Sequence, residues 1–340
     1  MKRPVQYNVV LMLIFLLLVG TVCLLPILQA VNTAPSQPST STTTTMPPET
    51  TVAPTTVPPT TAAPAVPPTT IPPATIPSTV QITAKNAFVY NCTRDHLAYI
   101  KDADNTVMYP ASITKLFSVY VALQYLEPSQ QVTVGLIIST TPEDSSFANL
   151  AVGDQLTVED LVAAMLLPSG GDAARVLSVE AGRAVAGDPN LTESAAVERF
   201  IAEMNRYALL EGMENTHFVN PDGYHHEDHY TSLQDLLTIG KLSMETELIG
   251  KIAGMTEYTA TVAAGRTLTW KNTNFLLQES FPEYYCPDAI GLKTGYTSAA
   301  GNCLMAAFEK DGQFILVGVF GCETKDSRFS DALTLFNVLQ

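Results

Sequence analysis

Basic residues are scarce in this chain of 340 residues. Lysine and arginine together number 18, against 33 aspartates and glutamates, so the formal net charge at pH 7 is −15. Proteins that bind nucleic acids neutralise phosphates with clustered lysine and arginine side chains. The acidic balance therefore disfavours nucleic acid as a partner, and it disfavours tight adsorption to other anionic polymers.

The chain also lacks the motif His-Glu-x-x-His, which places two zinc ligands and a general base on one helix. Histidines do gather in one segment, as His217, His225, His226 and His229, so a zinc peptidase stands as an alternative. This segment is polar and contains a glycine, which is typical of a surface loop with solvated histidines. We expect neither a metal site nor a cofactor.

Charge is absent from residues 9–28, which form an apolar run after Lys2 and Arg3. At about 1.5 Å per residue, a helix of this length spans the roughly 30 Å hydrocarbon core of a bilayer. The apolar core of a cleaved signal is shorter, at roughly 7 to 15 residues. We expect a transmembrane anchor at 9–31, with residues 1–8 in the cytoplasm and the remainder outside, because basic residues precede the run. Secretion after signal cleavage is the alternative.

Residues 32–80 contain one charged side chain, Glu49, and more than half of the chain's 23 prolines. Thr, Pro, Ala, Val and Ser dominate this block, and such a composition favours an extended polyproline II segment rather than a core. We expect a semi-rigid stalk, although a tether without a tuned length fits equally well. Residues 81–340 are long enough for one large domain with a substantial core.

Cysteine is sparse, with five residues in the whole chain. Cys23 falls in the apolar run, and Cys92, Cys286, Cys303 and Cys322 fall in the expected domain. None of them stands in a nucleophile motif. An extracytoplasmic compartment permits disulfides, but spacing does not give their connectivity, and four free thiols are equally compatible with the sequence.

Residues 110–123 combine a helix start with a possible nucleophile. Pro110 and Ala111 open an apolar run, and residues 112–115 read Ser-Ile-Thr-Lys. Ser112 and Lys115 then lie one helical turn apart, so the amine can reach the hydroxyl. Burial and the positive end of a helix both lower the pKa of such a lysine, which allows it to remove the serine proton. The pattern Ser-x-x-Lys is common by chance, and its weight depends on the rest of the chain.

Two further short motifs follow. Ser169 begins Ser-Gly-Gly in a turn between a helix predicted over 157–166, with a capping-box pattern and Pro168 after it, and a second helix starting near Asp172. A hydroxyl on such a turn can relay a proton. Lys-Thr-Gly at 293–295 ends an apolar segment and precedes apolar runs at 302–308 and 314–320, which predict a hairpin. A strand with a cation, a hydroxyl and a glycine can hold a substrate carboxylate.

The three motifs are expected on a helix start, a turn and a strand, in this order. Together they resemble the active-site signature of penicillin-recognising serine enzymes. With the strings at 110–116, 167–174, 215–223 and 293–301, the chain resembles the low-molecular-mass D-alanyl-D-alanine carboxypeptidases over roughly residues 82–340. The resemblance implies an α+β fold of the β-lactamase and DD-peptidase type. A five-stranded antiparallel sheet would pack with helices and a helical subdomain, and the active site would lie at their junction.

The resemblance also implies roles for residues of the first two motifs. Ser112 would attack the amide between the two terminal D-alanines of a peptidoglycan stem peptide, release the last residue and be deacylated by water. Lys115 would be the base, and Ser169 would shuttle the proton to the leaving amine. β-Lactam antibiotics would be covalent inhibitors, and the enzyme would work outside the bacterial cell membrane, to which its N-terminal segment attaches it.

The third motif and the last helix would bind the substrate. Lys293 and Thr294, beside Gly295, would hold the terminal carboxylate, and the backbone N–H groups of Ser112 and Tyr296 would form the oxyanion hole. Arg328 matches a family arginine that assists with the carboxylate. A solvated charge at a helix start is the alternative for Arg328.

Gly171 departs from the family pattern, which usually has asparagine as the third residue of the second motif. Losing such a hydrogen-bonding group costs on the order of 1 to 3 kcal/mol, so we expect either slow activity or another group in the same place. On this view, Gly171→Asn would retain or raise activity. Because of Gly171, a catalytically impaired wall-binding protein is a further alternative, although the joint presence of the other motif residues argues against it.

Two related enzymes are further alternatives. A class A β-lactamase needs a Glu-x-x-Leu-Asn loop for fast deacylation, and no such string occurs between Ser169 and Lys293. We therefore expect long-lived penicillin adducts rather than turnover. A DD-endopeptidase shares the chemistry of the carboxypeptidase, and the sequence does not separate the two.

Overall fold

The computed structural model describes residues 80–101, 107–262 and 265–338. The expected cytoplasmic segment at 1–8, anchor at 9–31 and nearly all of the stalk at 32–80 lie outside these residues. Within the described ranges, none of the helices combines the length and the apolar character needed to cross a bilayer.

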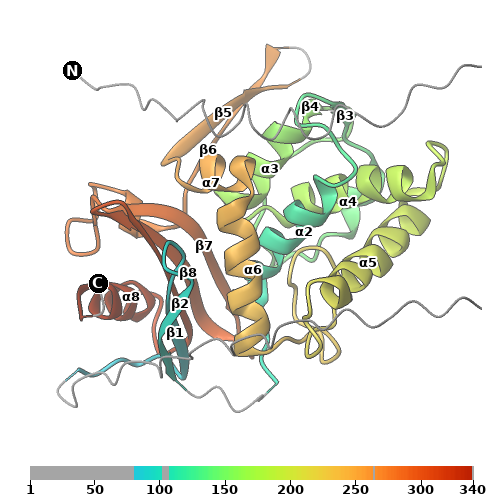
Figure 1. The fold of residues 1–340 in the computed structure, drawn as a ribbon. Helices are drawn as coiled ribbons and strands as arrows, with labels where there is room; N and C mark the ends of the chain where they lie inside the picture. The colour runs from blue at the N-terminus through green and yellow to red at the C-terminus, as the bar shows by residue number, and fades with distance from the viewer. Residues whose placement is uncertain (1–79, 102–106, 263–264, 339–340) are drawn as a thin grey trace, which may run out of the picture. The chain divides into compact units, whose positions relative to one another are not determined.

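A five-stranded antiparallel sheet, in the order β2-β1-β9-β8-β7, forms the centre of the domain (Figure 1). The two ends of the domain sequence build it together: β1 (Asn86–Asn91), β2 (His96–Lys101), β7 (Ala289–Thr297), β8 (Gly301–Lys310) and β9 (Gln313–Cys322). β8 and β9 form the predicted hairpin, with Lys310 opposite Gln313. Asp311 and Gly312 between them both have positive φ, which suits a two-residue turn in a twisted hairpin.

Helices cover both faces of the sheet (Figure 1). α8 (Ser327–Val338) packs on β8 and β9, where the rings of Phe308 and Phe336 stack with centroids 4.0 Å apart. α6 (Leu233–Glu245) lies on the other face against β1 and β9. Side chains along β8 alternate between the two cores, with Met305 in one and Leu304 in the other, as strand geometry requires. The predicted α+β architecture is confirmed.

The middle of the chain forms the helical subdomain. Its helices are α2 (Thr114–Ala122), α3 (Val158–Leu166), α4 (Gly171–Ala186), α5 (Glu193–Leu210) and α7 (Glu247–Ala253). Shorter elements complete it and connect it to the sheet: η1 (Ala111–Ile113), β3 (Gln131–Thr133), η2 (Leu136–Thr140), β4 (Gln155–Thr157), β5 (Glu257–Thr261), β6 (Thr267–Lys271) and η4 (Phe275–Leu277). The predicted capping box of Thr157 and Asp160 is present at the start of α3.

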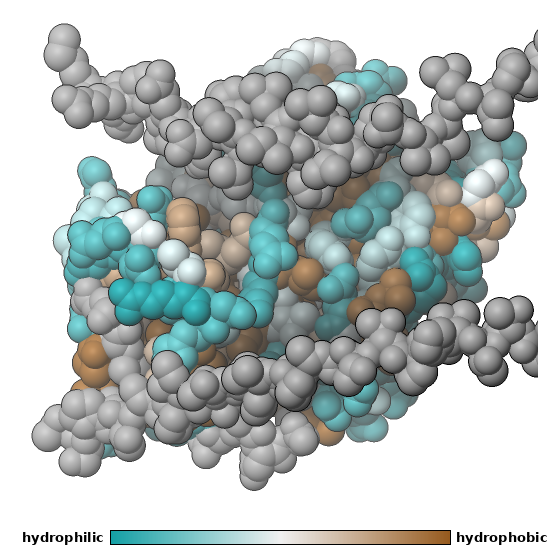
Figure 2. Space-filling model, in the orientation of Figure 1, coloured by the Kyte–Doolittle hydropathy of each residue, from teal (hydrophilic) through white to brown (hydrophobic). Residues whose placement is uncertain are grey.

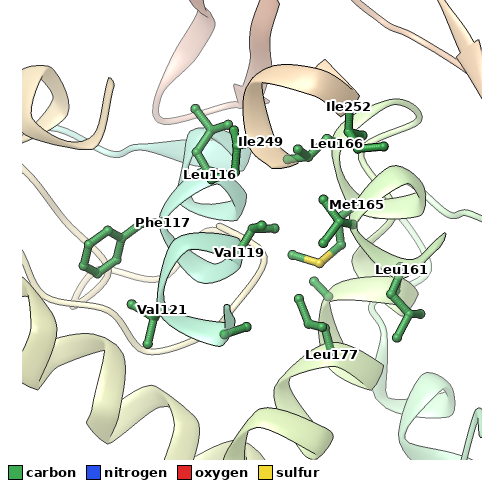
Figure 3. Packing of buried hydrophobic residues seen from close by; sticks show 14 of the residues in the cluster. Leu116, Phe117, Val119, Val121, Leu161, Met165, Leu166, Leu177, Ile249 and Ile252 are labelled. Atoms are coloured by element: carbon green, nitrogen blue, oxygen red, sulfur yellow. The ribbon is translucent and has the colours of Figure 1, made fainter. Parts of the chain in front are cut away.

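α2 is buried almost all round and sits at the centre of the subdomain. Figure 3 shows its side chains meeting those of three neighbouring helices: Leu116, Phe117, Val119 and Val121 of α2, Leu161, Met165 and Leu166 of α3, Leu177 of α4, and Ile249 and Ile252 of α7. Each fully buried side chain of this size contributes about 1.5 to 3 kcal/mol. The packing therefore holds η1 and the first turn of α2, which together carry the first motif, in a rigid position.

The surface shown in Figure 2 is mostly hydrophilic, with hydrophobic residues scattered among polar ones. The most exposed of the large hydrophobic side chains include Leu136, Leu209 and Leu210. Scattered exposed hydrophobic residues are normal for a folded domain and indicate no site by themselves.

Candidate active site

A pocket of about 880 Å³ lies between β7 and the helical subdomain. Residues of all three motifs line it: Ser112, Lys115, Ser169, Gly171, Thr294, Gly295 and Tyr296, together with Arg328 of α8. Lys293 does not line the pocket but is buried directly beside Thr294. The tertiary structure thus brings the sequence-predicted site residues together.

Ser112 and Lys115 are in contact at the floor of this pocket. The Nζ atom of Lys115 lies 3.0 Å from the Oγ atom of Ser112, and it donates a hydrogen bond of 2.6 Å to the backbone carbonyl of Asp222. Burial lowers the pKa of Lys115 to about 8, against the opposing effect of the Asp222 and Asp172 carboxylates. A fraction of the amine is therefore neutral near pH 7 and can accept the serine proton.

The backbone around Ser112 is shaped by two glycines from distant segments. A Cβ atom at Gly223, where φ is +78°, would lie 1.8 Å from the carbonyl oxygen of Ala111. A Cβ atom at Gly295 of β7 would lie 3.3 Å from the backbone nitrogen of Ser112. Both positions therefore let other chain segments approach the nucleophile segment closely.

Ser169 occupies the predicted turn between α3 and α4. Its φ of +67° is uncommon for a residue with a side chain, and only 6% of its surface is exposed. Strained backbone of this kind often occurs at functional sites. The turn presents Ser169 to the same pocket as Ser112.

Two buried cations stand on the β7 side of the pocket. Lys293 Nζ donates a hydrogen bond of 3.0 Å to the carbonyl oxygen of Thr294, and Arg328 Nη1 donates one of 3.3 Å to the carbonyl oxygen of Gly295. Burial lowers the pKa of Lys293 well below its usual value, with the charges of Lys115 and Arg328 adding to the effect. Burial also lowers the pKa of Arg328.

These cations lack anionic partners within the described part of the chain. Neither Lys293 nor Arg328 forms an ion pair there, and the buried Nε of Arg328 has no hydrogen-bond partner in the same residues. Arg328 is 4% exposed, so the alternative interpretation of this side chain as a solvated charge at a helix start is wrong. Buried unpaired cations favour an anionic ligand, and a carboxylate fits this arrangement.

Gly171 is the first residue of α4, and atoms of three other residues lie close to it. A Cβ atom there would lie 3.0 Å from Oδ2 of Asp222, 3.3 Å from Cγ2 of Thr141 and 3.4 Å from the carbonyl of Ser146. Sequence reasoning did not select Asp222 as a site residue. Its only local signal was its place in the string at 215–223, between His217 and His225 of the histidine-rich segment.

The histidine-rich segment is not uniformly solvated, which corrects the sequence-based view of it. His229 is 2% exposed; its Nε2 lies 2.9 Å from Oγ1 of Thr114, and its Nδ1 accepts the N–H of Val219 at 3.2 Å. Burial lowers the pKa of His229 to about 3, so it is neutral and supports the start of α2. Among the described residues, no three metal-ligating side chains come together.

The four cysteines in the described ranges, Cys92, Cys286, Cys303 and Cys322, are free thiols. Burial raises the pKa of Cys303 to about 11, so this thiol stays protonated and inert. The structure thus supports the free-thiol alternative for these four positions.

Comparison with known proteins gives consistent matches. A family model described as D-alanyl-D-alanine carboxypeptidase matches residues 73–324. The D-alanyl-D-alanine carboxypeptidase of Streptomyces sp. (strain K15) is 31% identical over 265 residues, which cover 75% of this chain and 87% of that protein. The D-alanyl-D-alanine endopeptidase of Escherichia coli (strain K12) is 26% identical, with 76% of this chain and 77% of that protein covered.

Solved structures agree with these matches. The Streptomyces K15 DD-transpeptidase aligns with a TM-score of 0.69 at 32% identity, covering 78% of this chain and 98% of that chain. Penicillin-binding protein D2 from Listeria monocytogenes, in its ampicillin-bound form, aligns with a TM-score of 0.61 at 25% identity, covering 77% and 99% of the two chains.

Proposed function

Because the chain belongs to the D-alanyl-D-alanine carboxypeptidase family, we propose that its reaction runs through an acyl-enzyme on Ser112. The chain is a serine D-Ala-D-Ala carboxypeptidase that trims peptidoglycan stem peptides. The observation that carries the assignment of the nucleophile is the 3.0 Å contact between Ser112 Oγ and Lys115 Nζ, in a pocket that faces two buried cations.

Acylation begins with proton transfer. The neutral amine of Lys115 takes the proton of Ser112, and Oγ attacks the carbonyl carbon of the penultimate D-alanine. The backbone N–H groups of Ser112 and Tyr296 stabilise the oxyanion. The exposed side chain of Tyr296 is not needed for this role.

The leaving group departs from the β7 side of the pocket. Lys293, Thr294 and Arg328 hold its carboxylate, and the hydroxyl of Thr294 is oriented by that of Thr273, 2.7 Å away. Ser169 relays the proton from Lys115 to the leaving amine, the amide bond breaks, and the terminal D-alanine leaves. Water then attacks the ester, and Ser112 recovers its proton.

The N-terminal part of the proposal concerns location. The family works on cell-wall peptides outside the cytoplasm. The apolar run at 9–28 fits an anchor over residues 9–31, and the Thr/Pro-rich block at 32–80 fits a stalk for the catalytic domain at 81–340. Full-length protein is expected in the membrane fraction. Its release as a form shortened at the N-terminus would instead support a cleaved signal.

The function is tested with the full chain, a fluorescent penicillin and a peptide that ends in D-Ala-D-Ala. We expect a long-lived adduct, mapped by mass spectrometry to the peptide containing Ser112, and release of one D-alanine per peptide. Rapid hydrolysis of the drug would indicate a β-lactamase instead. Cleavage of cross-linked dimers without trimming of free tails would indicate an endopeptidase, the activity named for the Escherichia coli relative.

A further inference from the structure

Asp222 accepts a hydrogen bond from Lys115 through its backbone carbonyl, but its buried carboxylate has no role in the steps above. Asp222 is 2% exposed, and its Oδ1 has no hydrogen-bond partner among the described residues. An unpaired buried carboxylate is costly, and its retention in a folded protein calls for a physical explanation. The explanation lies in what surrounds it.

The backbone of Asp222 is held firmly on two sides. Its carbonyl accepts the 2.6 Å hydrogen bond from Lys115, and the preceding carbonyl, that of Pro221, accepts one of 2.7 Å from Ser118 of α2. Gly223 packs against the carbonyl of Ala111. The position of the Asp222 side chain relative to Lys115 is therefore set by the same contacts that hold the nucleophile segment.

The Asp222 carboxylate also occupies the space in front of Gly171. Its Oδ2 lies 3.0 Å from the point where a Cβ atom of residue 171 would stand. In the usual family pattern an asparagine side chain starts from that point, beside the catalytic lysine. In this chain the asparagine is missing, and a carboxylate from a segment about fifty residues away fills its space.

We propose that Asp222 is a positioning residue that acts through Lys115 and replaces the asparagine side chain that Gly171 lacks. The proposal rests on the proposed function, because it assumes that Lys115 is the base. When the proton moves from Ser112 Oγ to Lys115 Nζ, a buried ammonium forms, and the nearby negative charge stabilises it. Asp222 itself transfers no proton in this scheme.

Other charges act on the same amine, and their effects must be separated. Asp172 and Arg175 of α4 raise and lower the pKa of Lys115 respectively. The charge of Lys115 acts in turn on Lys293 of β7, and that of Asp222 acts weakly on the Tyr224 phenol. Among the charges, Asp222 has the largest effect on Lys115. Without the negative charge of Asp222, burial and the nearby Arg175 are opposed only by Asp172, so the pKa of Lys115 falls further.

Asp222→Asn tests this inference through the pH profile of acylation by the fluorescent penicillin, measured from about pH 5 to 9 with the full chain. The wild-type rate falls on the acid side as Lys115 becomes protonated. In the variant we expect this acid limb to move down by about one pH unit and the maximal rate to fall about tenfold. A merely structural role would not move the limb.

Asp144→Asn is the matched control. Asp144 is an exposed carboxylate that lines the same pocket and accepts a hydrogen bond of 3.0 Å from Tyr224, but it is not among the charges that act on Lys115. We expect an unchanged limb and an unchanged maximum. If Asp222→Asn behaves like this control, the inference is overturned, whereas an unlabelled wild type would overturn the proposed function itself.

Gly171→Asn gives an independent test of the replacement. In the wild-type background the Cβ atom of the new side chain would lie 3.0 to 3.4 Å from Asp222, Thr141 and the Ser146 carbonyl, so we expect slower acylation here in place of the tolerance expected from the sequence alone. We expect acylation to be roughly tenfold slower than in the wild type, because crowding at this position displaces the Asp222 carboxylate. In an Asp222→Gly background the asparagine regains its space, and we expect Gly171→Asn to raise the rate. An equal effect in both backgrounds would contradict the proposal.

Discussion

Ser112→Ala abolishes the penicillin adduct and the release of D-alanine, because the variant has no atom to form the ester. Folding is expected to survive. The change removes one oxygen from a half-buried side chain, and Lys115 keeps its hydrogen bond to the Asp222 carbonyl. The expected change in unfolding free energy is within about 1 kcal/mol. Gel fluorescence measures the adduct, and urea denaturation measures the stability.

Ser178→Ala is the matched control for this loss. Ser178 is a buried serine of α4 whose hydroxyl donates to the Arg175 carbonyl at 2.7 Å, one turn earlier in its own helix. It does not line the active-site pocket. Labelling should be unchanged in this variant. An adduct that persists in Ser112→Ala would place the nucleophile elsewhere and would refute the assignment.

Lys115→Met lowers the acylation rate about 10²- to 10⁴-fold, the usual size of a general-base contribution. Methionine preserves much of the side-chain length and its packing in the first turn of α2, but it cannot accept a proton. Lys115→Arg is expected to fail as severely, because a guanidinium keeps its proton at any pH at which the protein folds. The second-order rate constant of penicillin acylation measures both effects.

The arginine variant separates proton transfer from charge. If a positive charge at position 115 were all that the site required, Lys115→Arg would retain most of the activity, and the assigned role of the amine would be wrong. Lys271→Met serves as the control, because Lys271 is an exposed lysine that lines the same pocket. We expect it to leave the acylation rate within about threefold of wild type.

Local signals in the sequence were enough for the elements that carry the motifs. The capping box at Thr157 and Asp160 marked the start of α3, and the apolar runs around Asp311 and Gly312 marked the β8–β9 hairpin. Capping and tight turns depend on side chains within a few residues of one another, so short stretches of sequence are sufficient to predict them.

Burial was harder to predict than secondary structure. Arg328 and His229 both stand in polar stretches whose composition is typical of solvent-exposed segments, yet each is almost fully buried. Their burial arises from distant segments, since Arg328 reaches the carbonyl of Gly295 on β7 and His229 reaches Thr114 of α2. Composition within one segment carries no information about what packs over it.

The sequence by itself determined the chemistry that this protein carries: a serine and a lysine one helical turn apart, a second serine on a turn, and a Lys-Thr-Gly strand, each encoded by neighbouring residues. Only the tertiary structure decided how these groups act on one another. The pKa of Lys115 depends on its burial, and the group that stands before Gly171 is a carboxylate from another loop. Both are properties of packing between segments far apart in the chain, and local sequence preferences do not specify them.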